Sequence, residues 1–222
     1  MNLALFDLDG TLLQGDSDHA FGEFLIGLGW ADATRHRQGN DAFYADYLAG
    51  KLDIHAYTAF STAPWRDRPP DELREVMARF LHEVAGPALP PRAHELVQRH
   101  REAGDVLAVV TATNDFITRP IAALLGVPTL IATDLARDAH DRVSGAIAGV
   151  PAYREGKVHR VNDWLAAQGL TLGDFGRVTF YSDSINDLPL LETVSHPVAT
   201  NPGAALQAIA EQRGWPILRL FE

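Results

Sequence analysis

Near its amino terminus the chain reads Leu3-Ala4-Leu5-Phe6-Asp7-Leu8-Asp9-Gly10-Thr11. The first four of these residues form a short, continuous apolar run, which is typical of a strand buried on both faces. Two aspartates, a glycine and a threonine follow and mark a turn at the carboxyl end of that strand. This stretch therefore predicts a buried strand that carries two carboxylates to one edge of a sheet.

The same pattern, an apolar run that ends in polar residues, recurs further along the chain. Val106–Val110 is followed by Thr111, and Val178–Tyr181 is followed by Ser182 and Asp183. Helical patterns separate these runs, and such alternation indicates an α/β fold with a parallel, Rossmann-like sheet. The other predicted strands are Thr129–Ala132 and His196–Ala199, and the predicted helices are Arg92–Ala103, Phe116–Leu125, Gly156–Gln168 and Ala204–Arg213.

Residues 14–86 interrupt this alternation. They have helical character, little strand character and many aromatic side chains. We expect a helical cap inserted after the first strand, with its aromatic side chains forming a small core of their own. The predicted domains are therefore a catalytic core, made of residues 1–13 and 87–222, and a cap made of residues 14–86. A short hairpin is predicted at residues 142–150.

The composition narrows the range of partners. A net charge of −10 argues against a nucleic-acid partner, because a phosphate backbone attracts basic surfaces. No apolar stretch approaches the roughly 20 residues that a membrane span requires, and the amino terminus lacks the basic region of a signal peptide. The chain has no cysteine, which excludes thiolate chemistry and fits a reducing cytoplasm. The sequence leaves the oligomeric state open.

The polar ends of the predicted strands bring several carboxylates to one place. In an open parallel sheet, ligands bind outside the carboxyl ends of the strands. Asp7, Asp9 and Asp183 would crowd there, and like charges raise one another's pKa. An Asp-x-Asp pair by itself is more often a turn or a helix cap. Here Mg²⁺ would relieve the repulsion, because it binds one or two carboxylates together with water and substrate phosphate.

These motifs and their order resemble those of the haloacid dehalogenase-like (HAD) hydrolase superfamily. The resemblance covers nearly the whole chain, because the helical insert corresponds to the C1 cap of that superfamily. Its subfamily IB, the phosphoserine-phosphatase-like enzymes, is the nearest group. Asp7-Leu8-Asp9-Gly10-Thr11 is similar to motif I, Thr111 to motif II, Lys157 to motif III, and Asp183-Ser184-Ile185-Asn186-Asp187 to motif IV.

The resemblance implies a Mg²⁺-dependent phosphatase that hydrolyses a small-molecule phosphomonoester through an aspartyl-phosphate. It assigns Asp7 as the nucleophile and Asp9 as the general acid and then the general base, roles that carboxylates can fill. The implied metal ligands are Asp7, the backbone carbonyl of Asp9, Asp183 and, directly or through water, Asp187. The implied substrate-binding residues are Gly10, Thr11, Thr111, Ala112, Lys157, Asn186 and Asp16.

The chain departs from the phosphoserine phosphatases at several positions. Gly10 replaces the usual serine of motif I, and Thr111-Ala112-Thr113 replaces Ser-Gly-Gly in motif II. Asp16 stands where those enzymes have a substrate-binding glutamate. Asp16 and Asp18 would attract an amine, which favours an amino-alcohol phosphate, such as phosphoserine or histidinol phosphate. An aspartate at the start of a helix is also a favoured N-cap.

Two other interpretations fit part of the pattern. A phosphomutase of the same superfamily would share every core motif but would return the phosphoryl group to a sugar. A receiver domain also gathers aspartates, a threonine and a lysine around Mg²⁺, but it is shorter, lacks the helical insert and carries its phosphoacceptor on a later strand. Length and motif order favour the phosphatase. A second anionic group on the substrate would need Arg66 or Arg68 as its partner.

Overall fold

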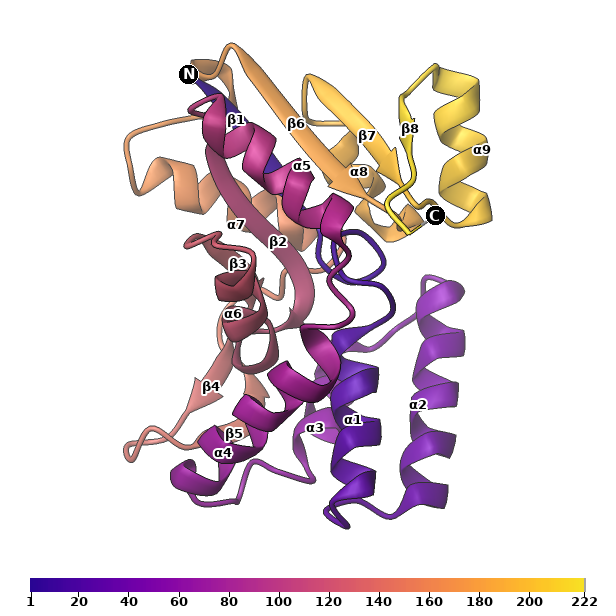
Figure 1. The fold of residues 1–222 in the computed structure, drawn as a ribbon, viewed down its shortest axis with the longest axis vertical. Helices are drawn as coiled ribbons and strands as arrows, with labels where there is room; N and C mark the ends of the chain where they lie inside the picture. The colour runs from indigo at the N-terminus through magenta and orange to yellow at the C-terminus, as the bar shows by residue number, and fades with distance from the viewer. Residues whose placement is uncertain (222) are drawn as a thin grey trace.

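The computed structural model describes residues 1–221 and contains a six-stranded parallel sheet in the order β3-β2-β1-β6-β7-β8 (Figure 1). Its central strand, β1 (Asn2–Phe6), is the first predicted strand. Within residues 1–221 no helix has the length and apolar character of a membrane span. The six-stranded parallel sheet confirms the predicted fold class, an α/β fold with a Rossmann-like sheet. The other strands of the sheet are β2 (Val106–Asn114), β3 (Leu130–Thr133), β6 (Arg177–Ser182), β7 (His196–Thr200) and β8 (Ile217–Leu218).

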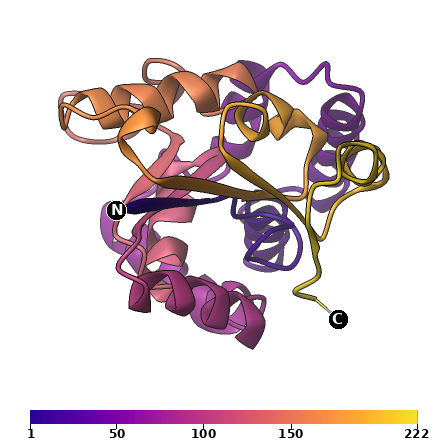
Figure 2. The same cartoon turned by 90° about the horizontal axis from the view of Figure 1, so that it is seen from above.

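Helices cover both faces of this sheet, as the view from above shows (Figure 2). In β1, Ala4 and Phe6 pack in one apolar cluster, and Leu3 and Leu5 pack in the other. Successive side chains of a strand point to opposite faces, so a continuous apolar run needs cover on both sides. One face is covered by α5 (Pro91–Glu102) and α6 (Asp115–Leu124). The other face is covered by α7 (Glu155–Ala166), α8 (Leu188–Leu191) and α9 (Ala204–Arg213). Two short 3₁₀ turns lie at Leu172–Asp174 and Ile185–Asp187.

Residues 14–86 fold into helices that lie beyond the carboxyl ends of the strands, in the lower part of Figure 1. The predicted helical character of this segment is confirmed. Asp16, Asp32 and Asp53 begin the first three helices, because their carboxylates accept hydrogen bonds from backbone amides of the first turn. The helices are α1 (Ser17–Gly27), α2 (Ala33–Leu48), α3 (Ile54–Thr62), α4 (Pro70–Phe80) and a π-helical turn, Leu81–Ala85.

The prediction that the aromatic side chains of this segment form a core of their own was only partly right. Phe43, Tyr57 and Phe60 pack on one another, but the most deeply buried rings join the core of the sheet domain. Trp65 stacks on Phe116 of α6 with ring centroids 4.2 Å apart. Phe21 lies 5.0 Å from Phe80 in an edge-on arrangement, and both belong to the apolar cluster that contains Phe6 of β1. A few short helices cannot enclose rings of this size by themselves. They bury the rings against the sheet domain instead, which gives one continuous core.

The predicted hairpin at residues 142–150 includes only the second strand of the real one. β4 (Leu135–Arg137) pairs antiparallel with β5 (Val143–Ile147). Asp138 forms the turn, because its carboxylate accepts hydrogen bonds from two backbone amides of the loop, one of them that of Arg142. β4 is too short to stand out as an apolar run, and for this reason the sequence pattern placed the hairpin late.

The shared core leads to a prediction for Trp65, which is 1% exposed. Trp65→Ala is expected to destabilise the protein by about 3–5 kcal/mol, because it removes a large buried ring from the junction of the helical segment and the sheet domain. Urea unfolding followed by circular dichroism measures this loss. Trp65→Phe keeps a ring against Phe116, and the indole N–H that it removes has no hydrogen-bond partner. Its loss of unfolding free energy should be less than half that of Trp65→Ala. An unchanged midpoint in Trp65→Ala would contradict the shared core.

Candidate active site

Lys157 is the buried centre of a site at the carboxyl ends of the strands. Its ammonium lies 2.7 Å from Oδ1 of Asp7, which follows β1, and 2.6 Å from Oδ2 of Asp187, which follows β6. Lys157 is 2% exposed. Burial alone would lower its pKa, but the carboxylates of Asp187 and Asp7 outweigh burial and raise that pKa above its ordinary value. The ammonium therefore stays charged and joins three segments that are far apart in the sequence.

Thr11 connects the nucleophile candidate Asp7 with Asp183. Its hydroxyl lies 3.1 Å from Oδ2 of Asp7 and 3.2 Å from Oδ1 of Asp183, and it also accepts a hydrogen bond from the backbone amide of Asp183 at 3.0 Å. Gly10 has a φ of 72°, and a Cβ there would collide with the Asp183 carboxylate. The glycine thus allows the segments of motif I and motif IV to approach closely.

Asp9 is held by two partners that the sequence pattern did not identify. The backbone amide of Ser17, at the start of α1, donates to Oδ1 of Asp9 at 2.7 Å, and the hydroxyl of Thr113 donates to Oδ2 at 2.8 Å. Thr113 is not among the residues that the sequence assigned to the site. It lies two residues after Thr111 in β2, and the two-residue period of a strand would have placed both side chains on one face.

Asn201 is a further residue of the site that sequence reasoning missed. It follows β7, and its side-chain amide donates to the carbonyl oxygens of Gly10 and Thr11, each at 3.1 Å. Its own carbonyl oxygen accepts a hydrogen bond from the backbone amide of Leu220 at 2.7 Å. The position of Asn201 at the carboxyl end of a strand was the available signal for a role in the site.

The carboxylates of the site carry raised pKa values. Burial, opposed by Lys157, raises the pKa of Asp7 to about 6, and burial together with Asp16 raises that of Asp9 to about 8. Burial and the neighbouring charge of Asp7 raise the pKa of Asp183 well above its ordinary value. The site therefore has more buried carboxyl groups than its single lysine can pair, and a bound cation would favour their ionised forms.

The donor set fits Mg²⁺. The carboxylates of Asp7 and Asp183 both contact the Thr11 hydroxyl, and Asp9 follows Asp7 two residues later in the chain. Within residues 1–221 no group of three or more His, Cys, Asp or Glu side chains is placed to hold a metal by itself. Mg²⁺ needs only one or two carboxylates, because water, a backbone carbonyl and substrate phosphate complete its shell. The two carboxylates and the backbone carbonyl of Asp9 could supply the protein's share.

Other predicted residues have different partners. Asp187 also accepts a hydrogen bond from Ser182 at 2.7 Å and so lies behind Lys157. The Asn186 amide donates to the backbone carbonyl of Tyr47 at 3.3 Å. The Thr111 hydroxyl is buried, and Ala112 follows it in β2. Each of these side chains is therefore bonded to, or buried among, other groups of the protein beside the site.

Asp16, Arg66 and Arg68, which the sequence suggested as contacts of the substrate, have other partners in the structure. Asp16 is exposed, and its carboxylate caps α1 by accepting a hydrogen bond from the amide of His19. Arg68 stacks over Trp30 at 4.3 Å, and Arg66 lies against Gly145 of the hairpin. The two arginines are thus engaged away from the carboxylates of the site.

The helical segment contacts the site at several points. The Tyr47 hydroxyl of α2 lies 2.7 Å from the Ser184 hydroxyl, and Arg154 donates to the carbonyl oxygen of Gly50 at 3.0 Å. The amide of Ser17 reaches Asp9 itself. The segment therefore lies over the polar ends of the strands.

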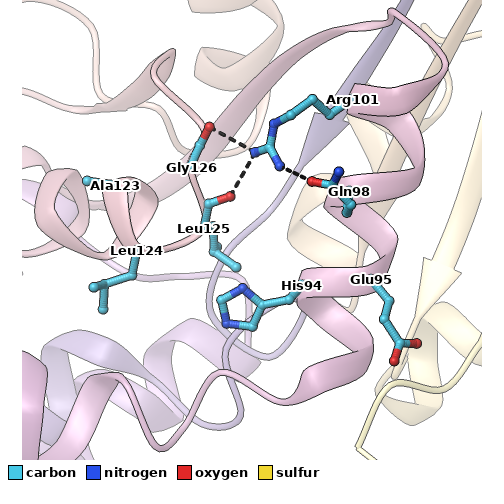
Figure 3. A pocket seen from close by; sticks show the side chains of 8 residues that line it. All are labelled: His94, Glu95, Gln98, Arg101, Ala123, Leu124, Leu125 and Gly126. Carbon is cyan, nitrogen blue, oxygen red and sulfur yellow. Dashed lines mark hydrogen bonds between the residues drawn. The ribbon is translucent and has the colours of Figure 1, made fainter.

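A separate surface groove of about 630 Å³ lies between α5 and α6 (Figure 3). Arg101 crosses it and donates to the carbonyl oxygens of Leu125 and Gly126 and to the side chain of Gln98. Two of these bonds satisfy the carbonyl groups of the residues that directly follow α6. None of the predicted site residues lines this groove.

Fold and geometry together define an α/β protein with a helical segment over the carboxyl ends of a parallel sheet, where several carboxyl groups gather around Lys157. A protein-family model described as haloacid dehalogenase-like hydrolase matches residues 4–192. The chain belongs to this family, and it is a phosphatase.

Similar proteins have been named or solved. A protein of Neisseria meningitidis serogroup C named histidinol-phosphatase is 45% identical over 217 residues, which are 98% of each chain. A Mycobacterium tuberculosis protein named as a probable phosphatase is 30% identical and is matched over 97% of this chain and 74% of its own length. The crystal structure of a Bordetella pertussis protein, described as having unknown function, superposes on this chain with a TM-score of 0.93. The two sequences are 46% identical, and the match covers 99% of each chain. Substrate-bound phosphoserine phosphatase shares the fold, with a TM-score of 0.68 at 18% identity over 97% and 91% of the chains.

The raised pKa of Asp9 predicts a pH dependence of stability. Between the ordinary carboxyl value near 4 and the folded value of about 8, the folded protein keeps a proton that the unfolded chain has lost. Stability must therefore fall as pH rises through this window, by at most about 1.4 kcal/mol per pH unit for this group. Asp9→Asn should flatten the curve obtained by urea unfolding in EDTA.

The matched control is Asp138→Asn. The backbone amide and side chain of Arg142 hold the pKa of Asp138 at about 2, so that its titration is complete below this window. The control should keep the wild-type slope between about pH 5 and pH 8. Parallel curves for wild type and Asp9→Asn would contradict the raised pKa of Asp9.

Proposed function

We propose that this phosphatase hydrolyses a small phosphomonoester with Mg²⁺ through an aspartyl-phosphate on Asp7. The observation that carries the proposal is the placement of Asp7 at the end of the central strand. Its carboxylate is 6% exposed and is held by Lys157 and Thr11. A carboxylate that is already oriented loses little freedom when it attacks phosphorus.

The two-step chemistry needs a proton donor that later becomes a base. In the first step an oxygen of Asp7 attacks phosphorus, the bond to the ester oxygen breaks, and Asp9 gives its proton to the leaving oxygen. In the second step water attacks the phosphoryl group, Asp9 takes a proton from that water, and the bond to Asp7 breaks to release phosphate. A pKa of about 8 supports this role, because Asp9 is then protonated at neutral pH.

We propose Asp7, the backbone carbonyl of Asp9 and Asp183 as the Mg²⁺ ligands. The bound ion would neutralise charge on the phosphoryl oxygens. Lys157 contacts Oδ1 of Asp7, and Thr11 contacts Oδ2. These contacts hold the carboxylate in one orientation toward the substrate.

We propose that residues 14–86 act as a cap on a core formed by residues 1–13 and 87–222. The contact of Tyr47 with Ser184 and that of Ser17 with Asp9 support this division of roles. A closed cap would exclude bulk water from the first step and would shape the space for the leaving group.

We infer an amino-alcohol phosphate as the substrate, with histidinol phosphate as the first candidate. The likeness to a protein named histidinol-phosphatase over nearly the whole chain supports this choice. A phosphate-release assay on histidinol phosphate, phosphoserine and several sugar phosphates tests it, and histidinol phosphate should have the highest kcat/KM. A leading sugar phosphate would contradict the inference. Isomerisation of a sugar phosphate without phosphate release would indicate a phosphomutase.

Asp7→Asn is expected to lower kcat by roughly 10⁴-fold or more, because the amide cannot serve as the nucleophile. Circular dichroism should show that the variant keeps its fold. Beryllium fluoride, which mimics a phosphoryl group on a carboxylate, should bind to the wild type and not to the variant. A folded Asp7→Asn protein with a near-normal rate would end the proposed mechanism.

Removal of Mg²⁺ with EDTA should abolish activity, and added Mg²⁺ should restore it. Asp183→Asn should raise the Mg²⁺ concentration for half-maximal activity by about tenfold or more, because it removes a direct ligand. Asp187→Asn should raise it less, since Oδ2 of Asp187 is bound by Lys157 and Ser182. Titration of activity with Mg²⁺ measures both effects, and full activity in excess EDTA would refute the proposed metal.

A further inference from the structure

Asp18, in the first turn of α1, is a buried carboxyl without a cationic partner. It is 7% exposed, and within residues 1–221 it forms no ion pair with a lysine, arginine or histidine. Its neighbours are the hydroxyl groups of Tyr57 and Ser61, which lie one turn apart on α3. Buried carboxylates are normally paired, so an unpaired one marks a place where a positive charge is missing.

Buried polar atoms near this carboxyl also lack partners. No hydrogen bond of normal geometry is formed by Ser17 Oγ, Asn40 Nδ2 or Ser61 Oγ, although each residue is at least nine-tenths buried. The hydroxyls of Ser17 and Ser61 lie close to the carboxylates of Asp9 and Asp18, and Asn40 Nδ2 has no such neighbour. The three side chains come from α1, which carries Asp18, from α2, and from α3, which carries its neighbours Tyr57 and Ser61. Gly22, one turn after Asp18, lies against α2 so closely that a Cβ would collide with Nε2 of His36, and Asn40 Nδ2 lies beside the same position. Native proteins leave few buried polar atoms unbonded, and a group of them points to an absent ligand.

This polar group adjoins the side of the site where the leaving group departs. Ser17, the residue before Asp18, donates its amide to Oδ1 of Asp9. Burial and the charges of Asp18, Asp16 and Asp9 raise the pKa of Tyr57, which places the phenol within electrostatic range of Asp9 as well as of Asp18. Asp9 is the proposed proton donor to the leaving oxygen, so the organic part of a substrate that extends from that oxygen under the cap would come to Asp18.

We propose that Asp18, with Tyr57 and Ser61, binds the cationic nitrogen of the leaving alcohol, and that Asp18 rather than Asp16 sets the preference for amine-bearing phosphates. This inference rests on the proposed function. Asp16 is exposed and its carboxylate caps α1. Asp18 is buried, so that its charge is less screened and a bound ammonium or imidazolium would interact with it more strongly.

Steady-state kinetics of Asp18→Asn test the proposal, because asparagine keeps the shape of the side chain and removes its charge. The substrates are histidinol phosphate, O-phosphoethanolamine, which has only an amine, and phenyl phosphate, which has no cationic group. Asp18→Asn should raise KM for histidinol phosphate by about tenfold or more, the usual loss for a hydrogen-bonded charge, and leave kcat within about threefold. Its kcat/KM for phenyl phosphate should stay within about twofold of the wild type. A similar loss on O-phosphoethanolamine identifies the amine as the bound group, and a loss confined to histidinol phosphate identifies the imidazole.

Asp16→Asn and Asp32→Asn are matched controls. Asp32 caps α2 through the amide of Arg35 and is exposed. Neither control should change the preference for histidinol phosphate over phenyl phosphate. Equal losses on all substrates in Asp18→Asn would mean that Asp18 only supports the cap, and they would overturn the proposal, as would an unchanged KM.

Calorimetric titration with histidinol, the free alcohol, separates this inference from the proposed function. The wild type should bind histidinol, and Asp18→Asn should bind it about tenfold or more weakly. If Asp18→Asn does not fold, Tyr57→Phe, which removes only a hydroxyl, should also bind histidinol more weakly. If the wild type releases no phosphate from any substrate, the proposed function is refuted but the role of Asp18 in binding the alcohol is not. Equal histidinol affinity in wild type and folded variants refutes the role of Asp18.

Discussion

The ion pairs of Lys157 with Asp7 and Asp187 are the contacts on which the rest of the site depends. They join residues that are 150 and 30 positions apart in the chain. Taking an ammonium out of water costs several kcal/mol, and only close, hydrogen-bonded carboxylates offset that cost. The parallel sheet supplies those carboxylates, because it ends its strands at one edge. The positions of Thr11 and Asp183 follow from where Asp7 is held.

The same burial leaves the site incomplete without ligands. One lysine faces several carboxyl groups, and burial raises the pKa of Asp7, Asp9 and Asp183. Such an arrangement lowers the stability of the ligand-free protein at neutral pH and favours whatever brings positive charge to the site. The unbalanced charge is thus a cost for folding and a source of affinity for binding.

The continuous core limits how the helical segment can move. Trp65 and Phe80 are packed with the sheet domain, so that the whole segment cannot swing away without exposing large rings to water. Its two connections also meet, because the amide of Gln14 donates to the carbonyl oxygen of Ala88 at 2.9 Å. Motion that admits a substrate is therefore expected in α2 and α3, whose contact with the core includes the Tyr47–Ser184 hydrogen bond.

The sequence by itself predicted most strands of the sheet, their alternation with helices, and the strand-end residues Asp7, Asp9 and Asp183, because apolar periodicity and strand-end polarity are local properties of the chain. Lys157 was assigned from the resemblance to the HAD motifs. Tertiary structure alone decided that Thr113 and Ser17 hold Asp9, that Asn201 holds the Gly10 turn, that Trp65 belongs to the common core, and that Asp18 is buried. Each of these depends on how far-apart segments pack, and side-chain packing between distant elements leaves no periodic pattern in a single sequence.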